Sequence, residues 1–362
     1  MIEPPPRDGE FVILGIETTC DETGAAVLAG PAPPGDAVPR VVSSVVSSQI
    51  GLHRTFGGVV PEIAARAHVR QILPVIDEAL SRAGVSFDRL DAIAVATRPG
   101  LVGALVVGLT AAKSLAYALG IPLVAIDHLE GHLYACRLAY PEREVYPCVG
   151  LVVSGGHTHL FTCKSPCEAE LLGGTTDDAA GEAFDKVASL LGLGYPGGPE
   201  IERAAKSGNP KAYAFPRTFL RDDRLEFSFS GLKTAVLYAL HGQNKREVRT
   251  DVDAATIADL AASFQEAVVD VLVAKCDQAL RKTGATRLGV GGGVAANGRL
   301  RERLEDLAVR RGIELFIPPL SLCTDNAALA AVAYSKLARG ETADLDIDVA
   351  AGLVRAGRKS GA

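Results

Sequence analysis

Residues 11–29, Phe-Val-Ile-Leu-Gly-Ile-Glu-Thr-Thr-Cys-Asp-Glu-Thr-Gly-Ala-Ala-Val-Leu-Ala, decide the fold of this chain. The apolar run over residues 11–17 predicts a buried strand, the polar segment over 18–23 a turn, and the apolar run over 24–29 the returning strand of a β-hairpin. The turn carries Asp21 and Glu22 beside several hydroxyl groups, more than a tight turn requires. An ordinary polar hairpin turn is the alternative interpretation.

The same plan returns over residues 149–163. An apolar strand over 149–153 is predicted to lead through the turn Ser154-Gly155-Gly156 into a second strand over 157–163. Each hairpin opens a segment of alternating predicted strands and helices. The sequence therefore predicts an α/β fold of two duplicated lobes, with a ligand in the cleft between them. Glycines in the second turn allow backbone N–H groups to approach phosphate oxygens.

Residues 127–132, Asp-His-Leu-Glu-Gly-His, follow a predicted strand over 121–126. His128 and His132 are four residues apart, so on a helix they share one face and can bind one metal ion. A third ligand has to come from elsewhere, and two structural histidines are the alternative. Glu130 lies roughly 200° around the helix from His128. This disfavours a zinc peptidase, in which the glutamate directly follows the first histidine.

Three further positions are candidates for chemistry. Asp325 precedes a predicted helix and is either its N-cap or the third metal ligand; position alone favours the cap. Asp185 shares a predicted helix face with two other acids, which is either solvated or able to accept hydrogen bonds from a ligand. Asn297 lies in the first turn of the helix predicted behind Gly291-Gly292-Gly293, where a nucleotide can bind. Asp177 or Asp178 is a candidate cap of the helix that carries Asp185.

Bulk properties bound the function. The chain has 362 residues, is 48% hydrophobic and 22% charged, and carries a formal net charge of −6. The acidic charge argues against a free-standing nucleic-acid binder. No uninterrupted apolar run reaches the ~18 residues of a membrane span, and the proline-rich N-terminus is not a signal peptide. Seven cysteines without a CxxC pair indicate a reduced cytoplasmic protein.

Together these motifs resemble the tRNA threonylcarbamoyl-adenosine transferase family, whose bacterial members are called TsaD. The matching stretches extend over about residues 11–338, and the CDETG and DDAAGEAFDK forms are those of the bacterial branch. Thr19 stands where the family often has serine, which keeps the hydroxyl. The matching segments are 15–23, 127–132, 153–158, 177–186, 195–199, 227–234, 291–297 and 323–326.

The resemblance implies an actin-like ATPase fold, as in actin, sugar kinases and heat-shock proteins, with the active site in the interlobe cleft. It implies one Fe(2+), or Zn(2+), held by His128, His132 and Asp325. It further implies transfer of the threonylcarbamoyl group from threonylcarbamoyl-AMP to N6 of adenosine-37 in tRNA, with release of AMP. We expect Asp21 and Glu22 to be catalytic. The expected substrate contacts are Val152, Val153, Ser154, Gly155, Gly156, Asp185, Gly198 and Asn297.

The expected partners are tRNA, a TsaB-like paralogue and a TsaE-like P-loop ATPase, with no membrane, in the cytoplasm. The helix predicted from Pro61 is a candidate docking surface for the paralogue. The arginines at 299, 301, 303, 310 and 311 contact tRNA phosphates or form a solvated helix face. An ATP-dependent small-molecule kinase of the same fold is the alternative function, and a non-enzymatic actin-like scaffold is a third.

The predicted domains follow from the duplication. A disordered extension covers 1–10. The N-terminal lobe comprises 11–127 with 325–345, and the C-terminal lobe comprises 128–324. A flexible tail covers 346–362.

Overall fold

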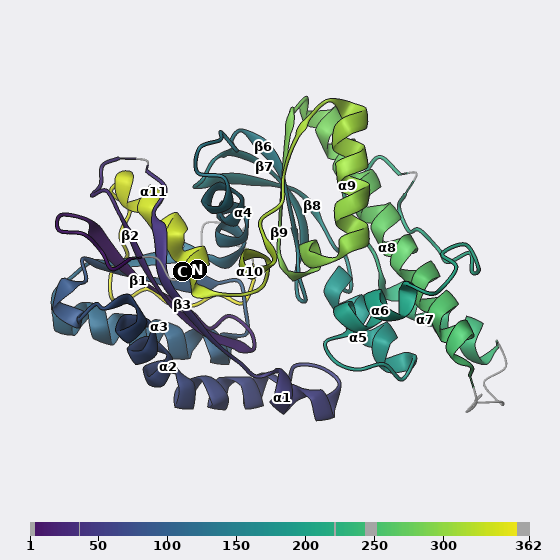
Figure 1. The fold of residues 1–362 in the computed structure, drawn as a ribbon, viewed down its shortest axis with the longest axis horizontal. Coiled ribbons are helices and arrows are strands. Elements are labelled where there is room, and N and C mark those ends of the chain that lie inside the picture. Colours follow the sequence, from purple (N-terminus) through teal and green to yellow (C-terminus); the bar gives the residue numbers. More distant parts are fainter. Residues whose placement is uncertain (1–3, 36, 221, 243–251, 353–362) are drawn as a thin grey trace, which may run out of the picture. The chain divides into compact units, whose positions relative to one another are not determined.

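The computed structural model describes residues 4–35, 37–220, 222–242 and 252–352. The chain divides into two compact units. Unit 1 contains the residues up to 53, residues 59–142 and the residues from 325 onward, and unit 2 contains residues 54–58 and 143–324. Figure 1 shows the elements of both units.

Unit 1 is built on a five-stranded sheet in the order β3-β2-β1-β4-β5. The central strand β1 pairs antiparallel with β2 and parallel with β4. The predicted hairpin of residues 11–29 is therefore confirmed as β1 and β2. The strands are β1 Phe11–Glu17, β2 Glu22–Gly30, β3 Arg40–Ser48, β4 Ala92–Arg98 and β5 Leu123–Asp127.

Alternation along β1 gives its two faces different partners. Val12, Leu14 and Ile16 join a core with residues of α2 and α3. Gly15 faces the opposite side, where a Cβ atom would lie 2.6 Å from the Cβ of Ala330 in η4. Glu17 shares that second face, where α4 also packs against η4. The helices of unit 1 are α1 Ile50–His53, α2 Pro61–Ala83, η2 Phe87–Arg89, α3 Val102–Leu119, α4 His128–Ala139, η4 Ala327–Ala331 and α11 Val332–Ala338.

Unit 2 repeats this sheet strand for strand, in the order β10-β9-β6-β7-β8. Its central strand β6 pairs antiparallel with β7 and parallel with β9. The predicted duplication is thus confirmed. The third strand of the meander, β8, has no sequence prediction because it is a mostly exposed edge without an apolar run. The strands are β6 Cys148–Val153, β7 Thr158–Ser165, β8 Glu168–Gly174, β9 Arg287–Gly291 and β10 Glu314–Phe316.

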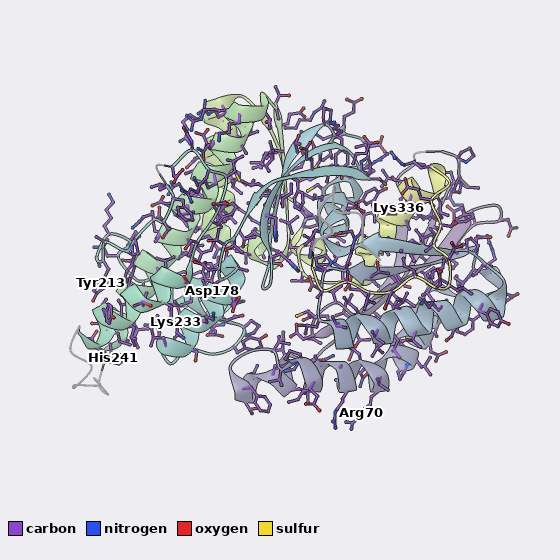
Figure 2. The ribbon with its side chains drawn as sticks, turned by 180° about the vertical axis from the view of Figure 1, so that it is seen from behind. Arg70, Asp178, Tyr213, Lys233, His241 and Lys336 are labelled. Carbon is purple, nitrogen blue, oxygen red and sulfur yellow. The ribbon has the colours of Figure 1, made fainter. Side chains whose placement is uncertain are left out.

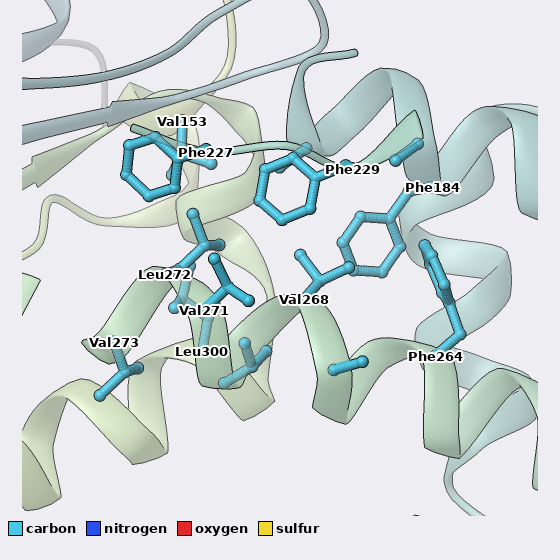
Figure 3. Packing of buried hydrophobic residues seen from close by; sticks show 14 of the residues in the cluster. Val153, Phe184, Phe227, Phe229, Phe264, Val268, Val271, Leu272, Val273 and Leu300 are labelled. Atoms are coloured by element: carbon cyan, nitrogen blue, oxygen red, sulfur yellow. The ribbon is translucent and has the colours of Figure 1, made fainter. Parts of the chain in front are cut away.

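The core of unit 2 lies between this sheet and its helices. Phe184 and Phe264 meet edge to face with ring centroids 5.2 Å apart, and Phe227 and Phe229 pack beside them (Figure 3). The remaining elements are η1 Arg54–Phe56, α5 Ala180–Leu190, α6 Gly197–Ala205, α7 Ser230–His241, α8 Ala254–Thr283, η3 Gly293–Ala296, α9 Gly298–Arg311 and α10 Leu320–Cys323.

Three expectations about the segments outside the core differ from the structure. Residues 4–10 are not a free extension, because Arg40 donates to the carbonyl oxygens of Pro4 and Pro5 and pairs with Glu10. Within the predicted tail, Ala350 donates its amide to Thr97, and residues 353–362 lie outside the described part. Residues 128–142 group with unit 1 rather than with the second lobe, because α4 packs on η4.

Helix α3 also qualifies the sequence analysis. Its 18 residues have a mean hydropathy of 1.6 and are by length and composition able to cross a membrane. Its inner face packs against α2 and β4, and Ala104, Leu105 and Leu109 are buried there. A core helix of a globular protein meets the same criterion, so the hydropathy of α3 carries no membrane argument.

Candidate functional site

Helix α4 begins directly at the end of β5 and places two histidines on one face. Asp127 caps it, because its Oδ1 accepts hydrogen bonds from the amides of Leu129 at 2.9 Å and Glu130 at 3.4 Å. His128 and His132 then lie one turn apart, with their Nε2 atoms separated by 3.1 Å. Both side chains are buried. The predicted pairing of the two histidines is confirmed.

Asp325 comes from a segment 193 residues further along the chain and joins the histidines. Its Oδ1 lies 3.1 Å from Nε2 of His132 and 3.6 Å from Nε2 of His128. The cap of η4 is instead Asn326, whose Oδ1 accepts the amide of Ala328 at 2.9 Å. The cap interpretation of Asp325, which position alone favoured, is therefore wrong.

These three side chains fit a divalent transition metal. Each offers one ligand atom, and the three atoms lie within 4.8 Å of one another. Two ligand atoms at about 2.1 Å from one metal lie about 3.0 Å apart at octahedral angles and about 3.4 Å apart at tetrahedral angles. Two of the observed separations, 3.1 Å each, fall within that range, and the third, 3.6 Å between His128 and Asp325, is slightly longer. Two imidazoles and one carboxylate are a donor set used by both iron and zinc.

Two residues at the end of β1 contact the far side of His128. Its Nδ1 lies 3.2 Å from Oε2 of Glu17 and 3.3 Å from Oγ1 of Thr19. Burial opposes a charged imidazole, but the carboxylates of Glu17 and Asp325 outweigh it and raise the pKa of His128 to about 9. Burial and the neighbouring His128 lower the pKa of His132. His128 is thus the more basic of the two rings.

Glu130 takes no part in this cluster. Its carboxylate pairs with Lys336 of α11, with Nζ 3.0 Å from Oε2, and Figure 2 shows the position of Lys336. The expectation that Glu130 points away from the two histidines is confirmed, and with it the argument against a peptidase helix.

The turn between β1 and β2 holds a pair of acids. Asp21 is 7% exposed. Burial, and then the nearby carboxylates of Asp21 and Asp325, raise the pKa of Glu22 to about 10. Two carboxyl groups this close do not both ionise readily, so one of the pair retains a proton at neutral pH. Ser48 donates its hydroxyl to Glu22 at 3.4 Å.

Buried polar side chains brace this turn against α2. His68, fully buried, contacts Oγ1 of Thr23 at 2.8 Å and the carbonyl oxygen of Cys20 at 3.0 Å. Gln49 donates its backbone amide to the carbonyl of Asp21 at 3.0 Å and its side-chain amide to Ala64 of α2 at 3.4 Å. The structural interpretation of His68 agrees with these contacts.

The corresponding turn of unit 2, residues 154–156, contains two glycines and no acidic residue. Val152 and Val153 are buried at the end of β6, while Gly155 and Gly156 are exposed, with no atom within 4 Å of a Cβ placed on either. The carbonyls of Ser154 and Gly155 accept the amides of Gly181 and Glu182 at the start of α5. These bonds fix the turn on the helix.

The other predicted substrate contacts also lie in unit 2 and have structural roles there. Asp185 accepts the amide of Gly197 at 2.7 Å and so fixes the segment that presents Gly198, beside which the structure leaves open space. Asn297 caps α9 through the amide of Leu300 and donates to Gln265 at 2.8 Å. The substrate roles of Asp185, Gly198 and Asn297 stay predictions.

In unit 2 the structure corrects one sequence interpretation and gives the contacts of the α9 arginines. Asp177 does not cap α5; it accepts the amides of Phe229 and Ser230 and therefore organises the start of α7. Arg299 and Arg303 are paired with Glu266 of α8, and Arg311 with Asp277. These ion pairs join α9 to α8, and contact of the arginines with tRNA phosphates stays a prediction.

Glu17 is the functional neighbour that sequence analysis missed. It closes an apolar strand and is 2% exposed. A buried carboxylate needs a partner, so a charged residue at the end of an apolar run was the available signal. The identity of that partner depends on the face of β1, which the sequence alone does not pair with α4.

Comparisons with known proteins identify the family. A family model described as "TsaD: tRNA N6-adenosine threonylcarbamoyltransferase" matches residues 40–332. A protein of that name from Rhodopirellula baltica is 49% identical over 97% of this chain and 99% of its own length. A protein of that name from Moorella thermoacetica is 51% identical over 94% of this chain and 96% of its own length.

Solved structures show the fold. T. kodakarensis HypF superimposes with a TM-score of 0.58 at 15% identity over 93% of this chain and 48% of that chain. Component A of the Acidaminococcus fermentans (R)-2-hydroxyglutaryl-CoA dehydratase gives a TM-score of 0.50 at 15% identity over 91% and 99% of the two chains. The predicted actin-like ATPase fold is confirmed.

Proposed function

This chain belongs to the tRNA N6-adenosine threonylcarbamoyltransferase family, and from that premise we propose how its own residues support the reaction. The enzyme forms N6-threonylcarbamoyladenosine in tRNA. The amine N6 of adenosine-37 attacks the carbamoyl carbon of threonylcarbamoyl-AMP, a C–N bond forms, the bond to the phosphate oxygen breaks, and AMP leaves. The close relatives carry the name of this transferase and do not favour the kinase alternative.

The proposal for the metal rests on one observation: His128, His132 and Asp325 converge from two distant segments with metal-ligand spacing. We propose one Fe(2+), or Zn(2+), bound by these three side chains. A divalent cation there supplies positive charge that orients and polarises phosphate or carbonyl oxygens of the adenylate. A kinase of this fold has no need of this donor set.

Unit 2 supplies the proposed adenylate contacts. The exposed backbone of Gly155 and Gly156 suits phosphate oxygens, because no side chain prevents their approach. Asp185 would act on the ligand directly or through the Gly197–Gly198 segment that it holds. Asn297, fixed by Gln265 and Leu300, is preorganised to contact the ribose or base.

Asp21 is the proposed acceptor of the proton that leaves N6, or the group that orients this amine. Within the acid pair, Glu22 retains its proton because burial and its neighbours raise its pKa. Asp21 is therefore the member of the pair that we assign as the general base. The brace from Gln49 and His68 holds the backbone of this turn, which keeps the carboxylate in a defined position.

The proposed partners follow the family. A TsaB-like paralogue would dock on α2, where Val69 and Leu73 are 64% and 66% exposed. Arg70 projects from the same helix (Figure 2). A TsaE-like P-loop ATPase would complete the complex, in the cytoplasm. The net charge of −6 suits a catalytic subunit whose partners share in holding tRNA.

The direct test is transfer by the purified full-length chain, together with its proposed partners, on threonylcarbamoyl-AMP and unmodified tRNA. Modified nucleoside and AMP would be quantified for wild type, Asp325→Ala and the control Asp346→Ala, which removes an exposed carboxylate further along the same segment. We expect transfer by wild type and the control and its loss in Asp325→Ala. Equal transfer by all three proteins would contradict the proposed site.

A further inference from the structure

The end of strand β1 carries a buried carboxylate whose two oxygens have different partners. Oε2 of Glu17 lies 3.2 Å from Nδ1 of His128, and Oε1 accepts the backbone amide of Thr19 at 2.7 Å. Glu17 is 2% exposed, and its partner His128 is also 2% exposed. One side chain thus connects a candidate metal ligand with the first residues of the acidic turn.

We propose that Glu17 is a positioning residue that fixes the tautomer and orientation of His128 so that its Nε2 faces the metal site. The proposal rests on the metal centre proposed above. A neutral imidazole that donates Nδ1–H to a carboxylate has its lone pair on Nε2, and that is the atom directed at His132 and Asp325. Glu17 contacts the Nδ1 side of the ring, away from Nε2, so its proposed action is through His128.

The two histidines differ in this respect. Nδ1 of His132 has no hydrogen-bond partner among the residues that the structure describes. Nδ1 of His128 has the carboxylate of Glu17 and, at 3.3 Å, the hydroxyl of Thr19. Among the contacts described, orientation of the His128 imidazole through Nδ1 therefore depends on Glu17, with Thr19 as a weaker second acceptor.

The substitution Glu17→Gln isolates this role with little change of shape. Glutamate can accept on both oxygens, which is what the amide of Thr19 and the imidazole of His128 require. Glutamine has one accepting oxygen and an NH₂ group that only donates. Either one of the two contacts is lost, or the NH₂ group donates to Nδ1 of His128 and favours the tautomer that carries its proton on Nε2.

The test measures metal affinity of the full-length chain without substrate, using Co²⁺ or Zn²⁺ in competition with a chelator. Removal of such outer-shell partners weakens metal binding by about 10–100-fold. We expect a loss in this range for Glu17→Gln, a smaller loss for Thr19→Val, and a changed visible absorption of bound Co²⁺ in Glu17→Gln.

The matched control is Asp91→Asn. Its carboxylate also accepts a backbone amide of β1, that of Val12 at 2.7 Å, but at the other end of the strand. We expect its metal affinity to equal that of wild type, even where melting shows a similar loss of stability. If Glu17→Gln does not fold, the metal affinity of Thr19→Val is used instead, because Thr19 makes the second contact to Nδ1 of His128.

Wild-type affinity and an unaltered Co²⁺ spectrum in Glu17→Gln, or in Thr19→Val if Glu17→Gln does not fold, would overturn the inference while leaving the metal centre intact. Absence of metal binding by wild type would overturn the metal centre itself, and the inference with it. An equal loss of affinity in Glu17→Gln and Asp91→Asn would assign the effect to general destabilisation and so also contradict it.

Discussion

The two units carry the same five-stranded sheet and opposite chemistry at the same turn. In unit 1 the turn after the central strand holds Asp21 and Glu22, and the sheet's last strand runs into a helix with two histidines. In unit 2 the equivalent turn holds Gly155 and Gly156. The sheets are conserved between units because they form the cores. The two turns differ in what they present: acidic side chains in unit 1 and exposed glycine backbone in unit 2.

Both turns nevertheless rest on a glycine of a neighbouring helix. A Cβ on Gly108 of α3 would lie 2.3 Å from Oγ1 of Thr18, and a Cβ on Gly181 of α5 would lie 2.6 Å from the carbonyl oxygen of Ser154. In both units a helix glycine therefore allows the turn to pack closely on the helix, and the two turns differ in the residues that they present. This predicts separable effects on chemistry and on binding.

The largest expected effect on the transfer rate comes from removing the acidic side chain of the unit 1 turn. Asp21→Ala removes the carboxylate proposed to accept the proton, and general-base catalysis contributes about 10²–10⁴-fold. We expect transfer to fall by that factor while threonylcarbamoyl-AMP binds with nearly the wild-type dissociation constant, measured by calorimetry. Loss of binding instead would make Asp21 a binding residue and remove the contrast with unit 2.

An intermediate effect separates the two turns directly. Gly181→Ala must displace the Ser154–Gly155 backbone, so we expect weaker binding of threonylcarbamoyl-AMP with unchanged metal content. Gly108→Ala must displace Thr18, so we expect slower transfer with nearly unchanged adenylate binding. A displacement of about 1 Å at a reacting group can change the rate by about 10²-fold.

Gly231→Ala is the control for both glycine substitutions. It lies on α7 with open space around a Cβ, and it should leave binding and transfer unchanged. Identical profiles for Gly181→Ala and Gly108→Ala would show that the turns do not divide binding from chemistry.

A smaller effect concerns the acid pair and pH. The folded protein raises the pKa of Glu22 from 4.5 to about 10, so it binds a proton that the unfolded chain releases above pH 4.5. The contribution of Glu22 to the free energy of unfolding is therefore most favourable below pH 4.5 and falls as pH rises toward 10. In metal-free protein, Glu22→Gln should raise the melting temperature at pH 8 by about 2–4 °C, roughly 1 kcal/mol.

The same substitution should give little gain at pH 4.5, which serves as the internal control. A gain that is equal at both pH values would come from packing rather than from proton linkage. No gain at pH 8 would contradict the protonated state of Glu22.

Features of the fold that depend on neighbouring residues in the sequence could be predicted, and those that depend on distant residues could not. Residues 11–17 and 149–153 are apolar runs, and the duplication, the hairpins and the histidine helix follow from such local patterns. Edge strand β8 has no such pattern, since its residues are exposed or only half-buried. Asp177 was misassigned because its helix partner, α7, lies 51 or more residues away in sequence.

The site shows the same limit. The two ligands on α4 follow from their i, i+4 spacing. Asp325 needed the family resemblance, because by position it is indistinguishable from a cap, and Asn326 turned out to be the cap. Glu17 was visible only as a charge at the end of an apolar strand, and its pairing with His128 depends on sheet and helix packing.

Metal content measured by elemental analysis tests the central claim most directly. The account predicts about one transition metal per chain in wild type and its loss in both His128→Ala and Asp325→Ala, two residues that belong to one cluster although they are distant in sequence. The control Asp346→Ala should retain it. Wild type without a transition metal, or an Asp325→Ala variant that keeps it fully, would contradict the account.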